Sequence, residues 1–369
     1  MVKDFKIDRV LIVVTSLLVL FGLIMVYSST MFIAKASHNG DSFYYLKKQA
    51  VWFVIGLIVT IIIASLKYPL YLDQKVIFTV LGLTILGLIL VFFTGKINNS
   101  CRWIRIAGFS VQPSEFAKIG IIMYLSYMLS RKNFDVNDIR KLLVVLIPFF
   151  IVELLIIKEP DLGNFMLILM TASVMLFISG LKIRYFFYSL LVLIPALYMV
   201  MQVHPDRMTR VMAFLSPDAY ASTHNFQVHQ SIYAVGSGGI FGKGLGNSTQ
   251  KLFYLPYAYS DFIFSVIGEE VGLVGSVAII GLFFVFLIRG LNIAKYSENR
   301  HAYLLVMGLT FMIVFQAMIN ISVTLGIFPT KGIPLPFISN GGTSLVACMI
   351  IAAIILNVSK HRKTVFSND

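Results

Sequence analysis

The chain has 369 residues, of which 58% are hydrophobic and only 13% charged. A soluble globular domain is about 45–50% apolar and about 25% charged, so this composition excludes an ordinary soluble enzyme and indicates a membrane protein. The formal charge of +13 would suit a nucleic-acid partner in a soluble protein. Lys and Arg gather in the cytoplasmic loops of membrane proteins, however, and we therefore expect no nucleic acid.

Ten apolar runs follow one another along the chain. Each is solidly apolar rather than alternating, which favours a membrane helix over a strand of a membrane barrel. The predicted spans are residues 10–29, 49–66, 76–94, 112–130, 142–157, 164–180, 185–203, 262–288, 303–326 and 342–358. We expect an all-α polytopic membrane protein with about ten transmembrane helices, in which residues 1–369 form a single domain.

The distribution of Lys and Arg predicts the orientation. With the N-terminus inside, the short inner segments carry a higher density of basic residues than the longer outer segments. This is the pattern of the positive-inside rule, so we expect both termini in the cytoplasm. Residues 204–261 then form a large extracellular loop between the seventh and eighth spans. A long loop in a compact protein is usually functional, which places the expected chemistry outside.

Charged residues inside the predicted spans are few, and each is costly in a membrane. Glu115 and Lys118 are three positions apart, so they either neutralise each other or contact a substrate. Glu153 has no charged partner close in the sequence, and its role stays open. Glu269 and Glu270 follow one another in the eighth span.

Asp261 stands directly before the eighth span. One interpretation is a helix N-cap, for which Asp is a common residue. The other is a general base at the membrane surface. In a helix, Glu269 would lie about 12 Å deeper and roughly 80° around from Asp261, whereas Glu270 would lie on the far side. We therefore expect Glu269, rather than Glu270, to share a cavity with Asp261, a setting that suits a general base with a tuned pKa.

Two irregular segments flank this region. Residues 236–246 contain six glycines but match no nucleotide-binding pattern. One interpretation is a shaped loop that packs against a substrate or against membrane helices. The other is a flexible linker. Residues 329–342 are too rich in Pro and Gly for a regular helix, and we expect them to close the outer cavity. Asp161 precedes the sixth span, where we expect it to cap the helix.

Several cations lie on the predicted outer side, and they either anchor the protein to lipid headgroups or together hold an anionic diphosphate. They are Arg102, Arg105, Arg207, Arg210, Lys243, Lys251 and Lys331. The two cysteines, Cys101 and Cys348, are far apart in the sequence and indicate neither a disulfide framework nor a zinc site. We expect two free thiols.

Six motifs resemble the signatures of one family, in that family's order. They cover residues 102–104, 112–118, 160–163, 242–251, 261–264 with 269–270, and 329–342. On these motifs the chain resembles, nearly from end to end, the SEDS family (shape, elongation, division and sporulation) of bacterial cell-wall polymerases, the FtsW/RodA type. Residues 250–256 and 329–332 are more similar to the division-type FtsW than to the elongation-type RodA. The departures from the family's pattern are Tyr257, Tyr259 and Ser260 before the aspartate, and Asn340 downstream.

The resemblance implies a peptidoglycan glycosyltransferase that polymerises lipid II into β-1,4 glycan on the outer face of the cytoplasmic (inner) membrane and releases undecaprenyl diphosphate. It implies an inverting transfer in which Asp261 takes the proton from the acceptor's 4-hydroxyl group. Glu269 and Glu270 are expected to support this site. The expected substrate-binding residues are Arg102, Gln112, Ser114, Glu115, Lys118, Arg207, Arg210, Lys331 and Ser339.

The same resemblance implies partners: a class B penicillin-binding transpeptidase and other membrane proteins of the divisome or elongasome. No cofactor is certain, although a divalent cation, Mg²⁺ or Mn²⁺, could assist the diphosphate. Two alternative functions stay open. One is a flippase for lipid-linked precursors, in which the polar residues would line a transport path. The other is a non-catalytic scaffold of the cell-wall machinery, in which Asp261 would be only a helix cap.

Overall fold

The computed structural model describes residues 7–66, 70–71, 73–94, 101–106, 108–203, 205–216, 225–252 and 255–361. This part of the chain contains twelve helices and two short strands. The helices are α1 (Arg9–Ser37), α2 (Tyr44–Ser65), α3 (Gln74–Val91), α4 (Pro113–Leu129), α5 (Ile139–Lys158), α6 (Leu162–Ile178), α7 (Ile183–Val203), α8 (Pro205–Leu215), α9 (Phe226–Ser237), α10 (Ile263–Lys295), α11 (Arg300–Thr324) and α12 (Gly342–Ser359). The strands are β1 (Ile104–Ile106) and β2 (Phe109–Val111).

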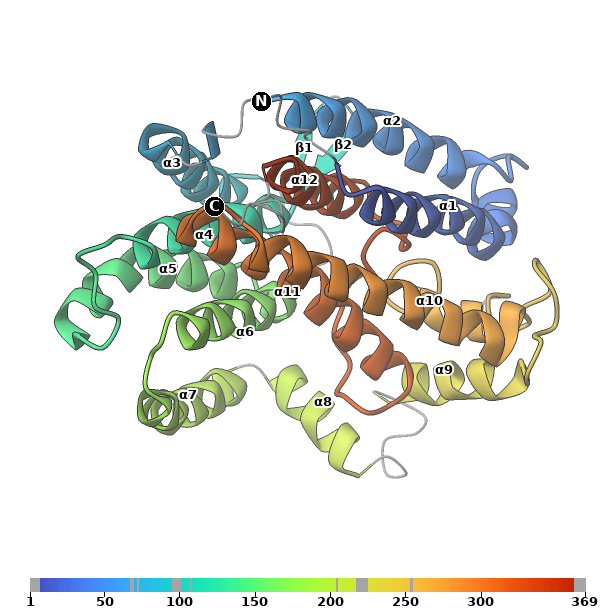
Figure 1. Ribbon diagram of the computed structural model, residues 1–369. Coiled ribbons are helices and arrows are strands. Elements are labelled where there is room, and N and C mark those ends of the chain that lie inside the picture. The colour runs from blue at the N-terminus through green and yellow to red at the C-terminus, as the bar shows by residue number, and fades with distance from the viewer. Residues whose placement is uncertain are drawn as a thin grey trace.

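The long helices form one bundle around α11 and α12 (Figure 1). α12 packs against α2, α10 against α11, and α3 against α4. Most residues of α11 and α12 are buried, whereas few residues of α2 are. A helix that is apolar all round is stable either in a protein core or against lipid. The sequence therefore supplies both the central helices and the helices that face the bilayer.

The all-helical, polytopic class predicted from the sequence is confirmed. Among the described residues, six helices are long and apolar enough to cross a membrane: α1, α2, α3, α10, α11 and α12. α6 is apolar but shorter, and α5 carries charges near both ends and in its middle. Each predicted span falls on a helix, but the count of ten spans and the single-domain organisation stay predictions.

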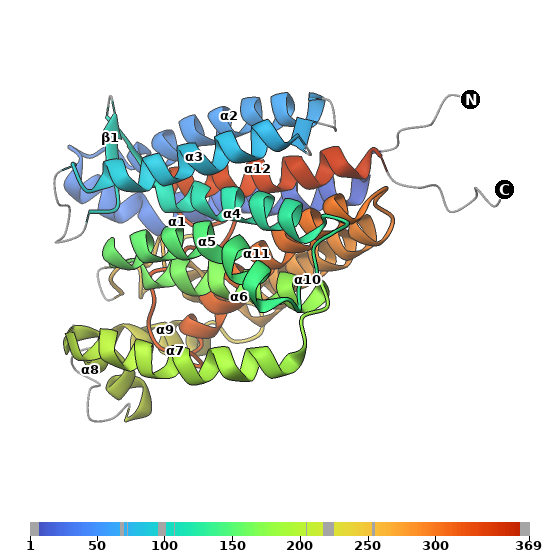
Figure 2. The same cartoon turned by 90° about the vertical axis from the view of Figure 1, so that its left-hand side faces the viewer.

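The first and last helices meet at one end of the bundle. The backbone N–H of Asp8, before α1, donates to Oγ of Ser359 at the end of α12 at 3.2 Å. The β1–β2 hairpin lies at the opposite end (Figure 2), and its pairs include Ile104 with Val111. The sequence did not predict this hairpin. We call the end of the bundle that carries β1 and β2 the hairpin end.

The segment 204–261 is not the structureless loop that its length suggested. It contains two helices, α8 and α9. α8 packs against α7, and α9 packs against α10 and α11. The apolar content of these helices is lower than that of the spans, so the hydropathy pattern did not separate them from a loop.

α10 is broken at Gly272, where φ is +69°, and the glycine loop 238–244 fills the break. Two carbonyl groups before the break and two N–H groups after it bond to the loop instead of to each other. The bonds run from the N–H groups of Lys243 and Gly244 to the carbonyls of Glu269 and Glu270, and from the N–H groups of Leu273 and Val274 to the carbonyls of Gly239 and Ile240.

The same loop depends on glycine for its close approach to α10. A Cβ atom on Gly242 would lie 2.2 Å from the carbonyl oxygen of Glu270, and one on Gly238 would lie 2.0 Å from that of Gly268. Gly242 also has a φ of +79°, which favours glycine. The glycine-rich segment is therefore a shaped loop rather than a flexible linker. It fixes the first two turns of α10, which follow Asp261 directly.

Candidate active site

A cavity of about 530 Å³ lies at the hairpin end, and Asp261 lines it. Its walls come from the start of α6, from α8 and α9, and from the irregular segment 329–332. The lining residues are Arg102, Pro160, Asp161, Leu162, Gly163, Arg210, Val211, Gln227, Tyr257, Asp261, Phe262, Pro329, Thr330, Lys331 and Gly332. Residues from four distant parts of the sequence therefore meet around one carboxylate.

Asp261 is not a helix cap, which corrects one of the two interpretations of its position. α10 begins at Ile263 with Phe262 as its N-cap, and no side chain caps this helix. The backbone carbonyl of Asp261 accepts a hydrogen bond of 2.8 Å from Nδ2 of Asn320 in α11, which also binds the carbonyl of Ile333. The backbone is thus anchored while the carboxylate faces the cavity.

The segment 329–332 lies directly against the Asp261 carboxylate. A Cβ atom on Gly332 would be 3.0 Å from Oδ2 of Asp261, so a larger residue at this position would press on the carboxylate. On the other side, Tyr257 adopts a φ of +58°, an uncommon conformation for a bulky residue and one that clusters at functional sites. The expectation that residues 329–342 are non-helical and close the cavity is confirmed for residues 329–332.

The surroundings of Asp261 raise the pKa of its carboxyl group toward neutral pH. Removal from bulk water raises the pKa of Asp261 to about 7. The positive charges of Arg102 and Arg210 act in the opposite direction and lower this pKa, whereas the negative charge of Asp161 raises it. Among the described residues, no donor forms a hydrogen bond with the carboxylate. A carboxylate with a pKa near the working pH suits a general base.

Asp161 is held rigidly at the start of α6. Its Oδ1 accepts from the backbone N–H of Asn164 at 3.3 Å, which confirms the predicted helix cap. Its Oδ2 accepts from Gln112 Nε2 at 2.9 Å, Ser114 Oγ at 3.1 Å and Asn164 Nδ2 at 2.9 Å. Gln112 and Ser114 were expected to bind substrate. They do not line the cavity and instead orient an aspartate that does.

Arg102 fixes the turn that precedes Asp161. Its Nε donates to the carbonyl of Glu159 at 3.0 Å, and its Nη2 donates to the carbonyl of Pro160. The Glu159 carboxylate is buried, and neither of its oxygens has a hydrogen-bond partner among the described residues. Burial, together with the negative charge of Asp161 and against the lowering effect of Arg102, raises the pKa of Glu159 to about 8. Arg102 therefore has both a structural role and a place in the cavity wall.

Two other expected substrate-binding cations, Arg210 and Lys331, also line the cavity. Arg207 belongs to α8, but its side chain lies outside the described residues. Ser339 does not line the cavity: its Oγ accepts from the N–H of Leu335 at 2.7 Å and donates to the carbonyl of Ser260 at 2.6 Å. It joins the segment that closes the cavity to the residue before Asp261.

Glu269 does not share the cavity with Asp261, so that expectation is wrong. Its Oε1 pairs with Lys243 Nζ at 2.7 Å and accepts from Thr249 Oγ1 at 2.8 Å. Its Oε2 accepts from Ser248 Oγ. Helical spacing alone pointed Glu269 toward Asp261, but the glycine loop and the residues after it cover this face of α10.

Glu270 is also neutralised. It forms an ion pair of 2.6 Å with Lys251 Nζ and accepts from Ser28 Oγ in α1. Lys251 and Glu270 are both almost fully buried, at 1% exposure each. Both glutamates therefore tie residues of the segment 243–251 to α10.

Glu115 and Lys118 neutralise each other. Of the two interpretations, an ion pair or a substrate contact, the structure shows the ion pair. Their side chains form a buried ion pair of 2.9 Å in α4. Lys118 Nζ also donates to Gln316 Oε1 at 3.0 Å, and Gln316 Nε2 donates to the carbonyl of Pro334 at 2.9 Å. The Gln316 amide therefore links this ion pair to Pro334, which lies two residues after the segment 329–332 that lines the cavity.

Glu153 is buried in α5, and neither carboxylate oxygen has a hydrogen-bond partner among the described residues.

The cavity does not fit a divalent cation as well as it fits an anion. In the described ranges, no group of three or more His, Cys, Asp or Glu side chains could hold a metal ion. Asp161 already accepts hydrogen bonds on both oxygens, which leaves it poorly placed as a ligand. The positive charges at the cavity are those of Arg102, Arg210 and Lys331. Both cysteines are free and neither lines it.

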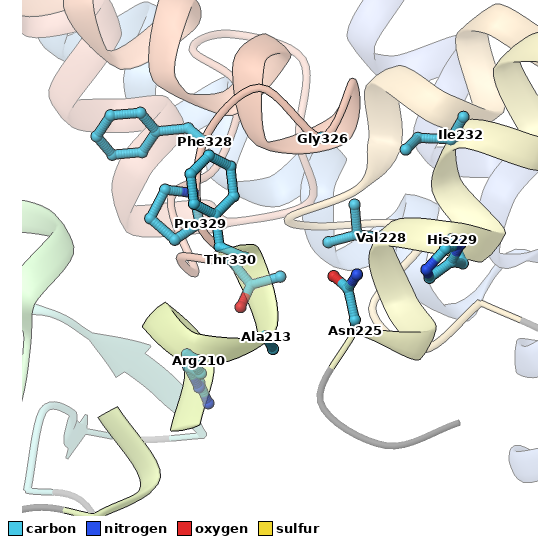
Figure 3. A pocket seen from close by; sticks show the side chains of 11 residues that line it. Arg210, Ala213, Asn225, Val228, His229, Ile232, Gly326, Phe328, Pro329 and Thr330 are labelled. Carbon is cyan, nitrogen blue, oxygen red and sulfur yellow. The ribbon is translucent and has the colours of Figure 1, made fainter. Parts of the chain in front are cut away.

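A second, smaller cavity adjoins the first and is shown in Figure 3. It lies between α8, α9 and residues 326–330, and it shares Arg210, Pro329 and Thr330 with the larger cavity. Sequence reasoning missed this cavity, the role of Asn320 and the place of Asp161 in the site. Asp161 belongs to one of the family motifs, and this could have indicated its place in the site. The hydropathy pattern gave no indication of α8 and α9.

The arrangement can accept a proton and stabilise a departing anion. The Asp261 carboxylate can act as a positioned base, and the guanidinium and ammonium groups around it can offset negative charge that develops during a transfer. Donors and cations fixed before the reaction need no reorganisation when that charge appears.

Comparisons with known proteins agree with this geometry. The model of the cell cycle protein family FtsW/RodA/SpoVE matches residues 8–364. A probable peptidoglycan glycosyltransferase FtsW of Trichlorobacter lovleyi is 37% identical over 96% of this chain and 94% of its own length. Stage V sporulation protein E of Bacillus subtilis is 37% identical over 96% of this chain and 98% of its own.

Two solved structures share the fold. The crystal structure of the rod shape determining protein RodA of Thermus thermophilus has a TM-score of 0.71 at 25% identity and covers 97% of this chain and 98% of its own. A chain of a peptidoglycan synthase complex has a TM-score of 0.80 at 24% identity and covers 96% of this chain and 98% of its own, which shows likeness of fold alone. The family model and the curated relatives extend over almost the whole sequence, and the chain belongs to the FtsW/RodA/SpoVE family.

Proposed function

We propose that this protein is a peptidoglycan glycosyltransferase that polymerises lipid II. Asp261 takes the proton from the 4-hydroxyl group of the acceptor sugar, whose oxygen attacks the anomeric carbon of the donor. The bond from that carbon to the diphosphate breaks, undecaprenyl diphosphate leaves, and a β-1,4 bond forms with inversion. The names of the curated relatives support a peptidoglycan glycosyltransferase.

One observation carries this proposal: the Asp261 carboxylate faces a cavity that also contains Arg102, Arg210 and Lys331. The raised pKa of Asp261, about 7, leaves a substantial fraction of it unprotonated at neutral pH and still basic enough to accept a proton. The cations stand where a diphosphate leaving group needs its negative charge offset. The same cavity therefore supplies both requirements of the reaction.

The site belongs, in this proposal, on the outer face of the cytoplasmic membrane, with both termini in the cytoplasm. The contact between Asp8 and Ser359 supports an even number of spans, because it joins the beginning of α1 to the end of α12. The cavity lies at the other end of the bundle, where the hairpin is found. Ten spans, with α8 and α9 lying outside the bilayer, satisfy both observations.

A class B penicillin-binding transpeptidase is the proposed partner, together with other membrane proteins of the division machinery. The likeness to a chain whose structure was described within a peptidoglycan synthase complex supports a partner of this kind. FtsW and stage V sporulation protein E relatives at 36–38% identity support a division-type or sporulation-type protein over an elongation-type one.

The two alternatives account for less of the geometry. A flippase places its binding site near the middle of the membrane between two alternating gates, whereas this cavity lies at one end of the bundle. A scaffold that uses Asp261 only as a helix cap has no support, because Asp261 does not cap α10.

The test is a polymerisation assay with the full-length protein, its transpeptidase partner and labelled lipid II. Wild type should produce glycan ladders on a gel, and Asp261→Asn should produce none while remaining folded. Asp41→Asn is the matched control, because Asp41 pairs with exposed Lys47 and does not line the cavity. Ladders from the Asp261→Asn variant, or none from wild type with its partner, would refute the proposal.

A further inference from the structure

A small cavity lies beside the candidate active site, between α8, α9 and residues 326–330. Its volume is about 80 Å³. Figure 3 shows Asn225, which precedes α9, and Val228 of α9 facing Ala213 of α8 and Thr330 of the segment 329–332. Arg210 belongs to the walls of both cavities, so a group bound here is continuous with a substrate bound at Asp261.

The walls of this cavity divide into an apolar part and a polar edge. Phe214, Val228 and Phe328 are among the apolar residues, and Asn225 and Thr330 contribute an amide and a hydroxyl group. His229 also lines the cavity, as does Arg210, which is shared with the larger cavity. An amide and a hydroxyl can donate and accept hydrogen bonds without adding charge. A group with an apolar end and a hydrogen-bonding end suits these walls, because its apolar part can pack against the phenylalanine and valine side chains while its polar part bonds to the amide and the hydroxyl group.

The size excludes a whole sugar ring. An apolar cavity of about 150 Å³ holds a molecule of benzene, so a cavity of about 80 Å³ holds only a group of roughly half that size. The acetamido group is such a group: it has one methyl and one planar amide. Each sugar of the proposed substrate carries an acetamido group at C2, which in the donor is the carbon next to the reacting anomeric carbon.

We propose that the small cavity binds the 2-acetamido group of a hexosamine that reacts at Asp261. The methyl group packs against Val228 and Ala213, and the amide bonds to Asn225 and Thr330. This inference rests on the proposed function and adds to it a site that determines which sugars are accepted. In this proposal α8 and α9 have a role in substrate selection, because they supply walls of this site.

The test uses lipid II analogues in which one acetyl group is replaced by the longer propionyl group. One arm carries the change on N-acetylglucosamine and the other on N-acetylmuramic acid, so the two arms distinguish the acceptor sugar from the donor. An added methylene in a filled pocket lowers kcat/KM by about 10–200-fold. We expect this loss for wild type in one arm, measured as the ratio of kcat/KM for the acetyl and propionyl substrates.

Val228→Ala enlarges the cavity and should reduce that ratio by at least about tenfold, since two methyl groups are removed from the wall. Val235→Ala is the matched control: it makes the same change in α9, but Val235 lines neither cavity. It should keep the wild-type ratio. A merely structural effect of Val228→Ala would lower both kcat/KM values together and leave the ratio unchanged.

Ala213→Val provides the reciprocal change, because it fills the cavity. It should shift preference from the acetyl substrate to a shorter formyl analogue in the same arm. A wild type that uses propionyl substrates as well as acetyl substrates in both arms would overturn the inference. So would ratios that neither variant alters. Failure of wild type to polymerise unmodified lipid II with its partner would instead refute the proposed function, so the two failures are distinguishable.

Discussion

Asp161 and Asp261 lie in one cavity although a hundred residues separate them, whereas Glu269 lies only eight residues from Asp261 and is outside that cavity. The two glutamates after Asp261 are paired with Lys243 and Lys251. The Asp261 carboxylate has no hydrogen-bond donor among the described residues and is held near neutral pKa by burial.

The difference separates carboxylates that stabilise the fold from a carboxylate that is available for chemistry. A buried acid whose charge is balanced by a close cation is poor as a base at neutral pH, because its ion pair stabilises the charged form. An acid at a cavity wall, with cations nearby but not bonded to it, retains a pKa near the working pH. Substitutions in the two groups should therefore affect different measurements.

The largest expected effect is on catalysis by Asp261→Asn. Loss of a positioned proton acceptor typically lowers the rate by about 10²–10⁴-fold, so kcat for lipid II consumption should fall by that amount. Thermal unfolding in detergent should occur at the same or a higher temperature, because the buried charge is removed. If Asp261→Asn lost activity only because it unfolds, Asp261 would not differ from the carboxylates that stabilise the fold.

Lys251→Met should act mainly on stability. It leaves Glu270 buried without its cation, which typically destabilises a protein by about 3–5 kcal/mol. Lys251→Met with Glu270→Leu should recover part of the lost melting temperature, because no uncompensated charge remains. Lys47→Met is the control: it breaks the exposed pair with Asp41, worth about 0–1 kcal/mol. Equal losses for Lys251→Met and the control would contradict the structural role of the buried pair.

The pH dependence should distinguish Asp261 from the paired glutamates. Its folded pKa of about 7 lies above its ordinary value of 3.8, so between these values the native state binds a proton that the unfolded state has lost. Its contribution to stability is therefore present at low pH and lost as pH rises to about 7. The melting temperature of Asp261→Asn minus that of wild type should grow over this window and level off above it.

Catalysis should follow the opposite direction, because the base must be unprotonated. Wild-type kcat/KM should fall as pH decreases below about 7, approaching tenfold per pH unit. Constant activity from pH 5 to 8, together with a constant difference in melting temperature, would exclude an aspartate with this pKa.

The smallest expected effect is that of Arg210→Ala. Arg210 lowers the pKa of Asp261, so its removal should move the acid limb of the kcat/KM profile to higher pH by a fraction of a unit. It should also raise KM, because Arg210 lines the cavity. The measurement is a pH–rate profile of both proteins. A shift to lower pH would show that Arg210 does not act on Asp261 as a positive charge.

Hydropathy in the sequence was sufficient to predict a helical, polytopic membrane protein, and each predicted apolar run falls on a helix. Long apolar runs must form helices in lipid, since no water is available to bond their backbone. The pairing of Glu115 with Lys118 was also one of two readings available from the sequence, because residues three apart share a helix face. Motif chemistry identified Asp261 and the cations Arg102, Arg210 and Lys331 as residues of one site, and all four line the cavity.

Only the tertiary structure decided which acidic residues face that cavity. Helical geometry is a local rule, and it could not show that a glycine loop interrupts α10 and covers Glu269. Nor could it show that Gln112 and Ser114 orient Asp161. These contacts join segments far apart in the chain, so they depend on how the helices pack. The sequence determined which groups carry charge, and packing determined which charges are neutralised and which one is left to react.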